Sequence, residues 1–198
     1  MSKILTLHGY VEENILSQLN DVELLVLDVD GTLTDGQVIL GGEDLDLKCF
    51  SAKDGLGMHL LHVYSITTAI ITGRSSQAVT RRARELHVAH VLMGISDKGQ
   101  ALLDLRGQLN LQGRCACIGD DLNDVPMFRQ ADFTACPQDA SSYIKTISSY
   151  VLMNPGGHGA VRELIDLMLI AKGHMDYDGG LTDFDTYLGA SRPAAPSP

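Results

Sequence analysis

The sequence has no long hydrophobic run and few basic residues. Within its 198 residues, no apolar stretch approaches the roughly 18 residues that a membrane-spanning helix needs. Residues 1–8 lack the basic start and the long apolar segment of a secretory signal, so we expect a cytoplasmic protein. Only 15 residues are Lys or Arg, against 25 Asp or Glu, which gives a net charge of −10. Such a surface repels nucleic acid and anionic membranes, and we expect neither as a partner.

Metal sites built from cysteine or histidine are not indicated either. Among the four cysteines, Cys115 and Cys117 lie two residues apart in an apolar run. No second cysteine pair and no histidine cluster at ligand spacing accompanies them, so the pattern favours buried free thiols over half of a metal site. The HExxH spacing of zinc proteases is also absent.

What the sequence does contain is an alternation of short apolar runs with amphipathic segments, in a length that suits one α/β domain. We expect a doubly wound, Rossmann-like parallel sheet that is covered by helices on both faces. The expected strands are 23–29, 66–71, 90–93, 114–118, 132–136 and 150–153, and the expected helices are 9–20, 54–64, 75–87, 97–109, a short segment ending at 128, and 158–172. We expect one domain over 1–173 and a flexible tail over 174–198, whose last seven residues are rich in Pro, Ala and Ser.

Two local features belong to this expectation. Residues 37–40 and 45–50 flank a Gly-Gly-Glu-Asp turn and predict a β-hairpin. Its Leu45, Leu47 and Cys49 alternate onto one face, opposite Asp46 and Lys48. This apolar face needs a partner, such as a neighbouring subunit or the protein's own core. Asp54 and Ser75 are the expected caps of the two helices that follow.

Polar residues gather where four of the expected strands end. Because the carboxyl ends of parallel strands meet at one edge of a doubly wound sheet, these residues should lie close together. The set is, in chain order, Asp28, Asp30, Thr72, Lys98, Asp120 and Asp124. Two unit charges about 4 Å apart repel by roughly 4 kcal/mol at an effective dielectric of 20, so the carboxylates need a counter-charge. Lys98 and a divalent cation supply it, and carboxylate and carbonyl oxygens suit Mg²⁺.

The same set predicts a phosphoryl-transfer reaction. A carboxylate can attack phosphorus and form an acyl phosphate, and Asp28 at the strand tip is the best-placed nucleophile. Asp30 can protonate the leaving alkoxide and then deprotonate the attacking water. Thr72 and Lys98 can bind and neutralise the phosphoryl oxygens.

The segments DVDGTLT, IITGR and GDDLND, together with the isolated Lys98, resemble the motifs of the haloacid dehalogenase superfamily in the right order. The resemblance implies that Asp28 is the nucleophile and Asp30 the acid/base. It also implies that Mg²⁺ is held by the Asp28 side chain, the Asp30 backbone carbonyl and Asp120, with Asp124 lying behind these ligands. The gaps between the motifs are too short for the cap domain that many members carry, so we expect a capless enzyme.

Residues 23–173 resemble a narrower family, the 3-deoxy-D-manno-octulosonate 8-phosphate phosphatases of lipopolysaccharide inner-core synthesis. The resemblance rests on DGQV, FSAKDGLG, AIITGR, SDK, GDDLNDVP and GGHGAVREL. It implies a small anionic sugar phosphate as the substrate and a homotetramer in which neighbouring subunits complete one another's sites. The implied substrate contacts are Asp30, Ser51, Ala52, Lys53, Asp54, Gly55, His59, Arg74, Arg82, Lys98 and Asn123.

The sequence departs from that family at three positions, because Lys53, His59 and His158 stand where arginine is usual. Lysine is a point charge that cannot make the bidentate contacts of arginine, and histidine is only partly charged at pH 7. A phosphorylated acidic sugar fits this basic character, with 3-deoxy-D-manno-octulosonate 8-phosphate first and a nonulosonate such as sialic acid 9-phosphate as the alternative.

Two readings from other classes compete with a phosphatase. A phosphoacceptor signalling domain also uses a strand-end Asp, Mg²⁺, a Thr and a Lys, but it lacks an acid two residues after the acceptor. A silent scaffold protein has no need to keep every motif residue intact. The presence of Asp30 and of the complete set favours the enzyme.

Overall fold

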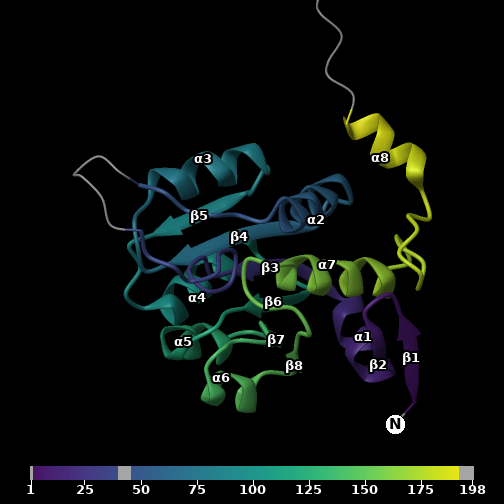
Figure 1. Cartoon of the computed structure of the whole chain (residues 1–198), viewed down its shortest axis with the longest axis horizontal. Coiled ribbons are helices and arrows are strands. Elements are labelled where there is room, and N and C mark those ends of the chain that lie inside the picture. The colour runs from purple at the N-terminus through teal and green to yellow at the C-terminus, as the bar shows by residue number, and fades with distance from the viewer. Residues whose placement is uncertain (1, 40–45, 192–198) are drawn as a thin grey trace, which may run out of the picture.

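The chain folds into a six-stranded parallel sheet between two layers of helices (Figure 1). The computed structural model describes residues 2–39 and 46–191. The strands of this sheet have the spatial order β5-β4-β3-β6-β7-β8. They are β3 (Val22–Leu27), β4 (Thr67–Thr72), β5 (His90–Met93), β6 (Arg114–Ile118), β7 (Phe133–Cys136) and β8 (Tyr150–Val151). The predicted doubly wound α/β class is confirmed, and the described residues contain no cap domain.

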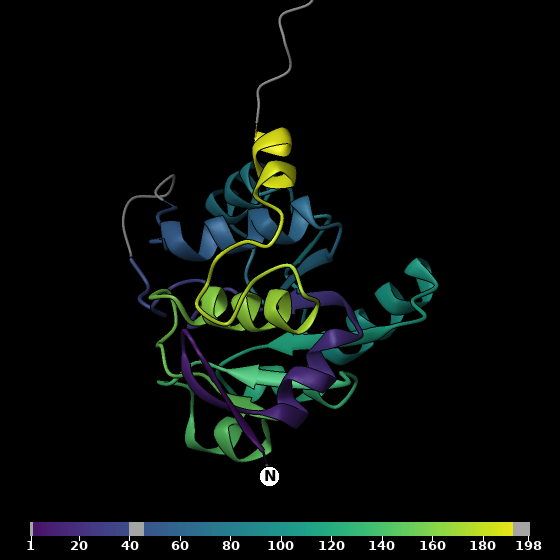
Figure 2. The same ribbon diagram turned by 90° about the vertical axis from the view of Figure 1, so that its right-hand side faces the viewer.

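The helices are α1 (Glu13–Asn20), α2 (Ala52–Val63), α3 (Gln77–Glu85), α4 (Lys98–Leu109), α5 (Val125–Phe128), α6 (Ser142–Ile147), α7 (Ala160–Ala171) and α8 (Phe184–Ser191), with a 3₁₀ turn η1 at Leu122–Asp124. Alternate residues of β3 point to opposite faces, so Leu25 and Leu27 pack with α1, α2, α3 and α7, whereas Leu24 and Val26 pack with α4, α5 and α6. Figure 2 shows the sheet between the two layers.

The buried thiols were predicted correctly. Cys115 and Cys117 are fully buried on the face that α4 and α5 cover, and all four cysteines are free. By contrast, the short helix α6 was not predicted, because residues 142–147 show little apolar periodicity.

The predicted helix over 9–20 was wrong in its first turn. Residues Lys3–Thr6 (β1) and Gly9–Glu12 (β2) form an antiparallel hairpin instead, and α1 begins only at Glu13. Gly9 has φ = +88°, which a hairpin turn accepts and a helix does not. Val11 still packs into the core, so its apolar spacing with Ile15 indicated a shared core and not a continuous helix.

The predicted β-hairpin over 37–50 was also wrong in its arms. Residues 37–39 and 46–50 have no strand geometry, and the predicted turn at 41–44 lies outside the described residues. Asp46 anchors the returning arm, because its carboxylate accepts bonds from Ser76 Oγ at 2.9 Å and from the Ala78 N–H at 2.9 Å. The arm is therefore held by side chains and not by strand pairing.

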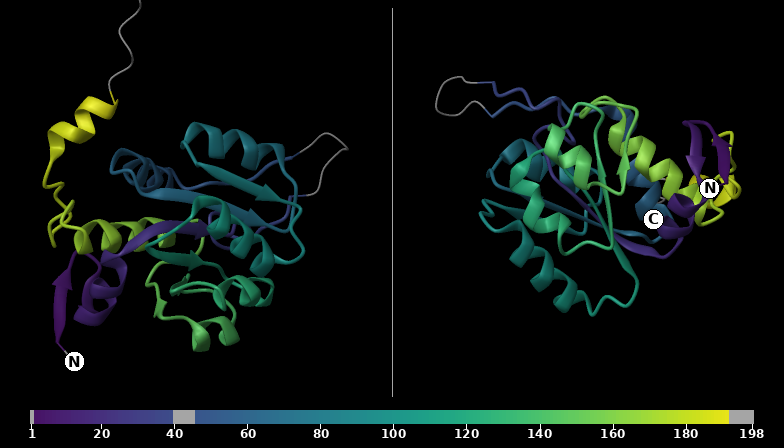
Figure 3. Two further views of the ribbon diagram at one scale, coloured as in Figure 1. Left: turned by 180° about the vertical axis from the view of Figure 1, so that it is seen from behind. Right: turned by 90° about the horizontal axis from the view of Figure 1, so that it is seen from below.

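The segment after α7 returns to the domain before it forms α8. Met175 and Leu181 form an isolated antiparallel bridge, and His174 stacks on Tyr64 of α2 with ring centroids 4.3 Å apart. Figure 3 shows this segment beyond the end of α7, near the N-terminal hairpin. Residues 192–198 lie outside the described part, and the predicted flexibility of the tail stays a prediction. No helix among the described residues is long and apolar enough to cross a membrane.

Candidate active site

The site lies at the carboxyl edge of the three central strands. Asp28 directly follows β3, Thr72 is the last residue of β4, and Asp120 is the second residue after β6. The backbone N–H of Asp28 donates to the Ile118 carbonyl at 3.0 Å, which extends the pairing of β3 with β6 by one residue to Asp28. Because β3 lies between β4 and β6, the strand order itself brings these residues together.

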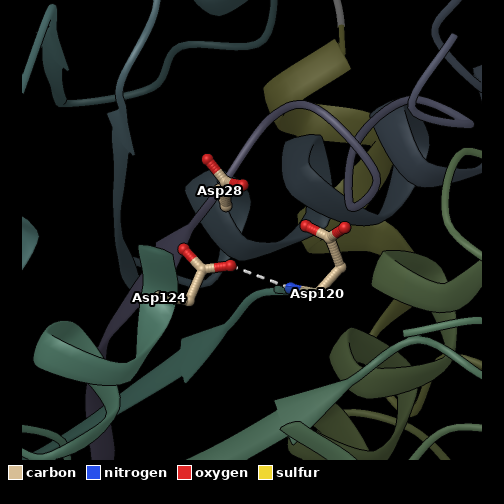
Figure 4. Close-up of side chains that lie close together, drawn as sticks. All are labelled: Asp28, Asp120 and Asp124. Atoms are coloured by element: carbon tan, nitrogen blue, oxygen red, sulfur yellow. Dashed lines mark hydrogen bonds between the residues drawn. The ribbon is translucent and has the colours of Figure 1, made fainter. Parts of the chain in front are cut away.

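Three carboxylates converge at this edge (Figure 4). Asp28, Asp120 and Asp124 each present an oxygen within 4.8 Å of the others. Asp124 is fully buried, and its Oδ2 accepts bonds from the N–H groups of Asp120 at 2.9 Å and Asp121 at 3.3 Å. Asp124 therefore holds the 119–121 turn in place, which leaves Asp28 and Asp120 as the candidate metal ligands of the cluster.

Lys98 is the cation of the cluster. Its side chain is 2% exposed, and Nζ lies 2.7 Å from Asp28 Oδ1 and 2.6 Å from Asp124 Oδ1. Lys98 is the first residue of α4, and the Asp97 side chain caps that helix by accepting a bond from the Gln100 N–H. Although burial opposes its charged form, the two carboxylates raise the pKa of Lys98, so the ammonium is kept.

One lysine does not neutralise the cluster. Burial, with repulsion from Asp124, raises the pKa of Asp28 to about 6 despite the nearby Lys98. Burial, with repulsion from Asp28 and Asp124, raises the pKa of Asp120 to about 8. The site thus holds more negative charge than its protein groups compensate.

The residues fit a hard divalent cation. Asp120 Oδ1 is buried and has no hydrogen-bond partner among the described residues. Gly31 has φ = +89°, and a Cβ atom at that position would lie 2.1 Å from Asp120 Oδ2, so glycine lets the loop after Asp30 close over this carboxylate. Free carboxylate oxygens at short mutual distances are the donor set that Mg²⁺ prefers.

A pH dependence of stability follows from these two carboxyl groups. An acid whose pKa is higher in the folded than in the unfolded state destabilises the fold as pH rises between the two values. For Asp120 that window runs from its ordinary value near 4 to about 8. We expect the metal-free protein to lose up to about 3 kcal/mol of unfolding free energy between pH 6 and 8, and Mg²⁺ to remove most of this loss.

Chemical denaturation with EDTA and with Mg²⁺ at several pH values measures this effect. Asp120→Asn should flatten the metal-free profile, whereas the exposed Asp104→Asn should leave it unchanged. A metal-free stability that rises from pH 6 to 8 would contradict the electrostatic description of the cluster.

Asp30 has a partner that sequence reasoning missed. Lys48, on the returning arm of the 36–50 loop, forms an ion pair with Asp30 Oδ1. The signal in the sequence is the alternation of Asp46 and Lys48 with Leu47, which is typical of a segment that turns its polar side chains to one side.

Several expected substrate contacts line one cleft next to the site. Ser51, Ala52 and Lys53 surround a cleft of about 480 Å³, together with Asp35, Cys49, Phe50, Gly157 and His158. Lys53 and His158 are exposed and supply its basic groups. Gly157 reaches this position because its N–H donates to the Thr32 carbonyl at 3.0 Å, which packs the GGHG segment onto the loop after Asp28.

Other expected contacts have partners within the fold. Asp54 is buried and accepts bonds from the N–H groups of Gly159 and Arg162, so it connects α2 to the start of α7. The predicted helix caps were wrong. Helix α2 is capped by Ser51, one turn before Asp54, and α3 is capped by Ser76, one residue after Ser75. Arg82 donates to the Ser51 carbonyl at 3.4 Å and crosses over Gly55, where a Cβ atom would lie 2.1 Å from its Nη2.

The remaining three contacts are spread out. Arg74 is exposed and lines a separate depression of about 250 Å³ with Lys48 and Asp46. Asn123 is exposed in η1 beside Asp124. The His59 ring lies about 6 Å from the rings of His62, His87 and Tyr187, and His59 does not line the cleft that holds Lys53 in the described part of the chain. Within one subunit, the structure does not bring His59 to the carboxylates.

Comparisons with known proteins agree with this geometry. The model of a haloacid dehalogenase-like hydrolase family matches residues 87–164. The chain is 36% identical over 178 residues to the 3-deoxy-D-manno-octulosonate 8-phosphate phosphatase of Yersinia pestis, which covers 89% of this chain and 95% of the relative. A crystal structure of the Yersinia pestis phosphatase superposes with a TM-score of 0.85 over 91% of this chain and 98% of that chain, at 36% identity.

A second solved structure is described with its ligands. It is the 3-deoxy-D-manno-octulosonate 8-phosphate phosphatase of Moraxella catarrhalis, in complex with a magnesium ion, a phosphate ion and a KDO molecule. It is 37% identical to this chain, and the match covers 91% of this chain and all of that chain with a TM-score of 0.79.

Proposed function

Because the chain belongs to the 3-deoxy-D-manno-octulosonate 8-phosphate phosphatase family of haloacid dehalogenase-like hydrolases, and is a phosphoric monoester hydrolase, we propose that its substrate is 3-deoxy-D-manno-octulosonate 8-phosphate. The products are the free sugar and inorganic phosphate. The observation that carries the chemistry is the placement of Lys98 between Asp28 and Asp124, with Asp120 beside them. In a lipopolysaccharide-producing cell this reaction belongs to inner-core sugar synthesis, and we place it in the cytoplasm.

The reaction proceeds in two displacements at Asp28. A carboxylate oxygen of Asp28 attacks phosphorus, the bond from phosphorus to the sugar oxygen breaks, and an aspartyl phosphate forms. Asp30 donates a proton to the departing sugar oxygen and then takes a proton from the water that attacks the aspartyl phosphate. Phosphate then leaves, Asp28 is again a free carboxylate, and Asp30 again carries the proton that it donated in the first step. The identity of residue 30 separates this reaction from a phosphoacceptor domain, in which the acyl phosphate persists.

The negative charge of the phosphoryl group that is transferred is balanced by cationic and hydrogen-bonding groups around Asp28. Lys98 holds Asp28 in position by its 2.7 Å contact and offers its ammonium to the phosphoryl oxygens. Thr72, at the end of β4, is buried and offers a hydroxyl at the same edge of the sheet. Mg²⁺, held by the Asp28 and Asp120 carboxylates and the Asp30 backbone carbonyl, would neutralise the phosphoryl oxygens.

The cleft beside the site fits an anionic sugar. Its basic groups, Lys53 and His158, are the candidates to bind the sugar carboxylate, and Ser51 and the first turn of α2 supply polar groups. The Lys53 ammonium is a single point charge and cannot make the bidentate contact of an arginine. Recognition of the sugar therefore depends more on the other residues that line the cleft.

We also infer that subunits assemble around the 36–50 loop, as a homotetramer that completes each site. The loop exposes Val38 (52%), Ile39 (44%) and Leu47 (52%), and a capless site needs another surface to exclude water. His59 does not line the cleft of its own subunit, and Arg74 is exposed beside Lys48, so both are candidates for contacts to a neighbour's substrate.

A substrate panel tests the proposed function. Phosphate release is measured for 3-deoxy-D-manno-octulosonate 8-phosphate, sialic acid 9-phosphate and simple hexose phosphates, each with Mg²⁺ and with EDTA. We expect kcat/KM for the octulosonate to exceed that for hexose phosphates by at least about 100-fold, and EDTA to abolish turnover. Equal rates across the panel would reject the substrate, a preference for the 9-phosphate would select the nonulosonate alternative, and undiminished activity in EDTA would reject the metal.

A further inference from the structure

The returning arm of the 36–50 loop reaches the site through Lys48. The Lys48 side chain is 10% exposed and its ammonium pairs with Asp30 Oδ1, whereas the neighbouring Leu47 is 52% exposed. Asp46 and Lys48 are two residues apart on this arm, and the side chains of both contact the domain. Two residues of one short arm thus make polar contacts to the body of the protein.

Asp30 differs from the other carboxylates of the site in how it is held. Asp28 and Asp124 are fixed by Lys98, and Asp124 also by two backbone N–H groups. The Asp30 side chain is 23% exposed and lies in the loop after β3, where the Lys48 ammonium contacts it. Lys48 therefore supplies the interaction that selects one orientation of this carboxylate.

The position of Lys48 is itself determined by a second contact. Asp46 accepts bonds from Ser76 Oγ at 2.9 Å and 3.1 Å and from the Ala78 N–H at 2.9 Å, at the first turn of α3. This contact places the arm next to the N-terminus of α3, the helix that follows β4. Thr72 is the last residue of β4. Helix α3 therefore holds Asp46, and Lys48, two residues later on the same arm, holds Asp30.

We propose that Lys48 is a positioning residue for Asp30, which it holds in the orientation from which this carboxylate exchanges a proton with the leaving and attacking oxygens. The proposal rests on the proposed function, because it acts through the acid/base role of Asp30. It gives the 36–50 loop a task inside its own subunit, in addition to its exposed apolar side chains. A displaced acid/base costs rate in both displacements, because proton transfer needs hydrogen-bond distance.

A double-mutant cycle separates this role from the alternatives. The variants are Lys48→Met, Asp30→Asn and the double variant, with kcat and KM measured on the best substrate of the panel. We expect Lys48→Met to lower kcat by about 10- to 100-fold with KM changed less than about twofold, and Asp30→Asn to lower kcat by about 100- to 10,000-fold. In the Asp30→Asn background, Lys48→Met should have no further effect.

Three controls accompany the cycle. Lys172→Met is the matched change, because Lys172 is a partly buried lysine that donates to the Asn20 carbonyl at the opposite end of the sheet, and it should keep the wild-type kcat. Lys48→Arg should restore much of the rate, since it keeps a cation on the arm. Asp46→Ala should lower kcat in the same manner as Lys48→Met, and combining the two should add little. Thermal unfolding of each variant shows whether it is folded.

The outcomes distinguish the positioning role of Lys48 from the acid/base role of Asp30, on which it depends. A large rise in KM with kcat unchanged in Lys48→Met would assign Lys48 to substrate binding and overturn the positioning role. Effects of Lys48→Met and Asp30→Asn that multiply, or a wild-type rate in Lys48→Met, would overturn it as well. A wild-type rate in Asp30→Asn would instead remove the acid/base role of Asp30 from the proposed function.

Discussion

Replacing Asp28 with asparagine is expected to lower kcat by at least about 10⁴-fold while the protein stays folded. The amide cannot form the acyl phosphate, so the two-step route is closed and the remaining groups only bind substrate. The variant removes one negative charge from a crowded cluster, and Lys98 keeps its contact with Asp124 at 2.6 Å. Its stability without metal should therefore equal or exceed that of the wild type. Steady-state phosphate release and denaturant unfolding measure the two quantities.

The matched control for this change is Asp104→Asn, which alters an exposed carboxylate in the middle of α4. It should leave both kcat and stability near their wild-type values. An Asp28→Asn protein that retains a tenth or more of the wild-type kcat, with no deamidation detected by mass spectrometry, would show that another group accepts the phosphoryl.

Replacing Lys98 with methionine is expected to damage stability and turnover together. The ammonium is buried between two carboxylates, and removing one member of a buried charged set costs about 3–5 kcal/mol. The pKa values of Asp28 and Asp120 should rise further, because the cation that lowers them is gone. We therefore expect the loss of stability to grow as pH increases from 6 to 8, and kcat to fall by at least about 100-fold.

Urea unfolding at both pH values, with EDTA and with Mg²⁺, tests this second prediction. Mg²⁺ should recover part of the stability and little of the rate, because a cation at Asp28 and Asp120 does not replace a donor to the phosphoryl oxygens. Lys172→Met serves as the comparison for the loss of a lysine elsewhere. A Lys98→Met protein as stable as the wild type at pH 8 would contradict the role of Lys98 as counter-ion.

The convergence of the candidate site residues was predictable because the sheet topology determines it. Parallel strands deliver their carboxyl ends to one edge, so Asp28, Thr72 and Asp120 had to meet once the strands were identified. Lys98 followed from its place at the start of a helix on that edge. These inferences need only the period of the hydrophobic pattern and the order of the motifs.

The parts that failed depend on contacts between distant segments. Asp54 is an acceptable helix cap by residue type, but it turns to the start of α7, more than a hundred positions later in the sequence. The arm that carries Lys48 has the alternation of a strand and is held by Asp46 at α3. The segment 9–12 has helical spacing and pairs as a strand because residues 3–6 supply its partner. No local pattern contains these partners.

The most direct test of the account is a crystal structure of the protein grown with Mg²⁺ and beryllofluoride, which mimics a phosphoryl group on aspartate. We expect one ion about 2.1 Å from side-chain oxygens of Asp28 and Asp120 and from the Asp30 carbonyl. We also expect beryllium on the other Asp28 oxygen, within reach of Lys98 and Thr72. Beryllium on a different residue, or an ion that Asp28 and Asp120 do not share, would contradict this arrangement.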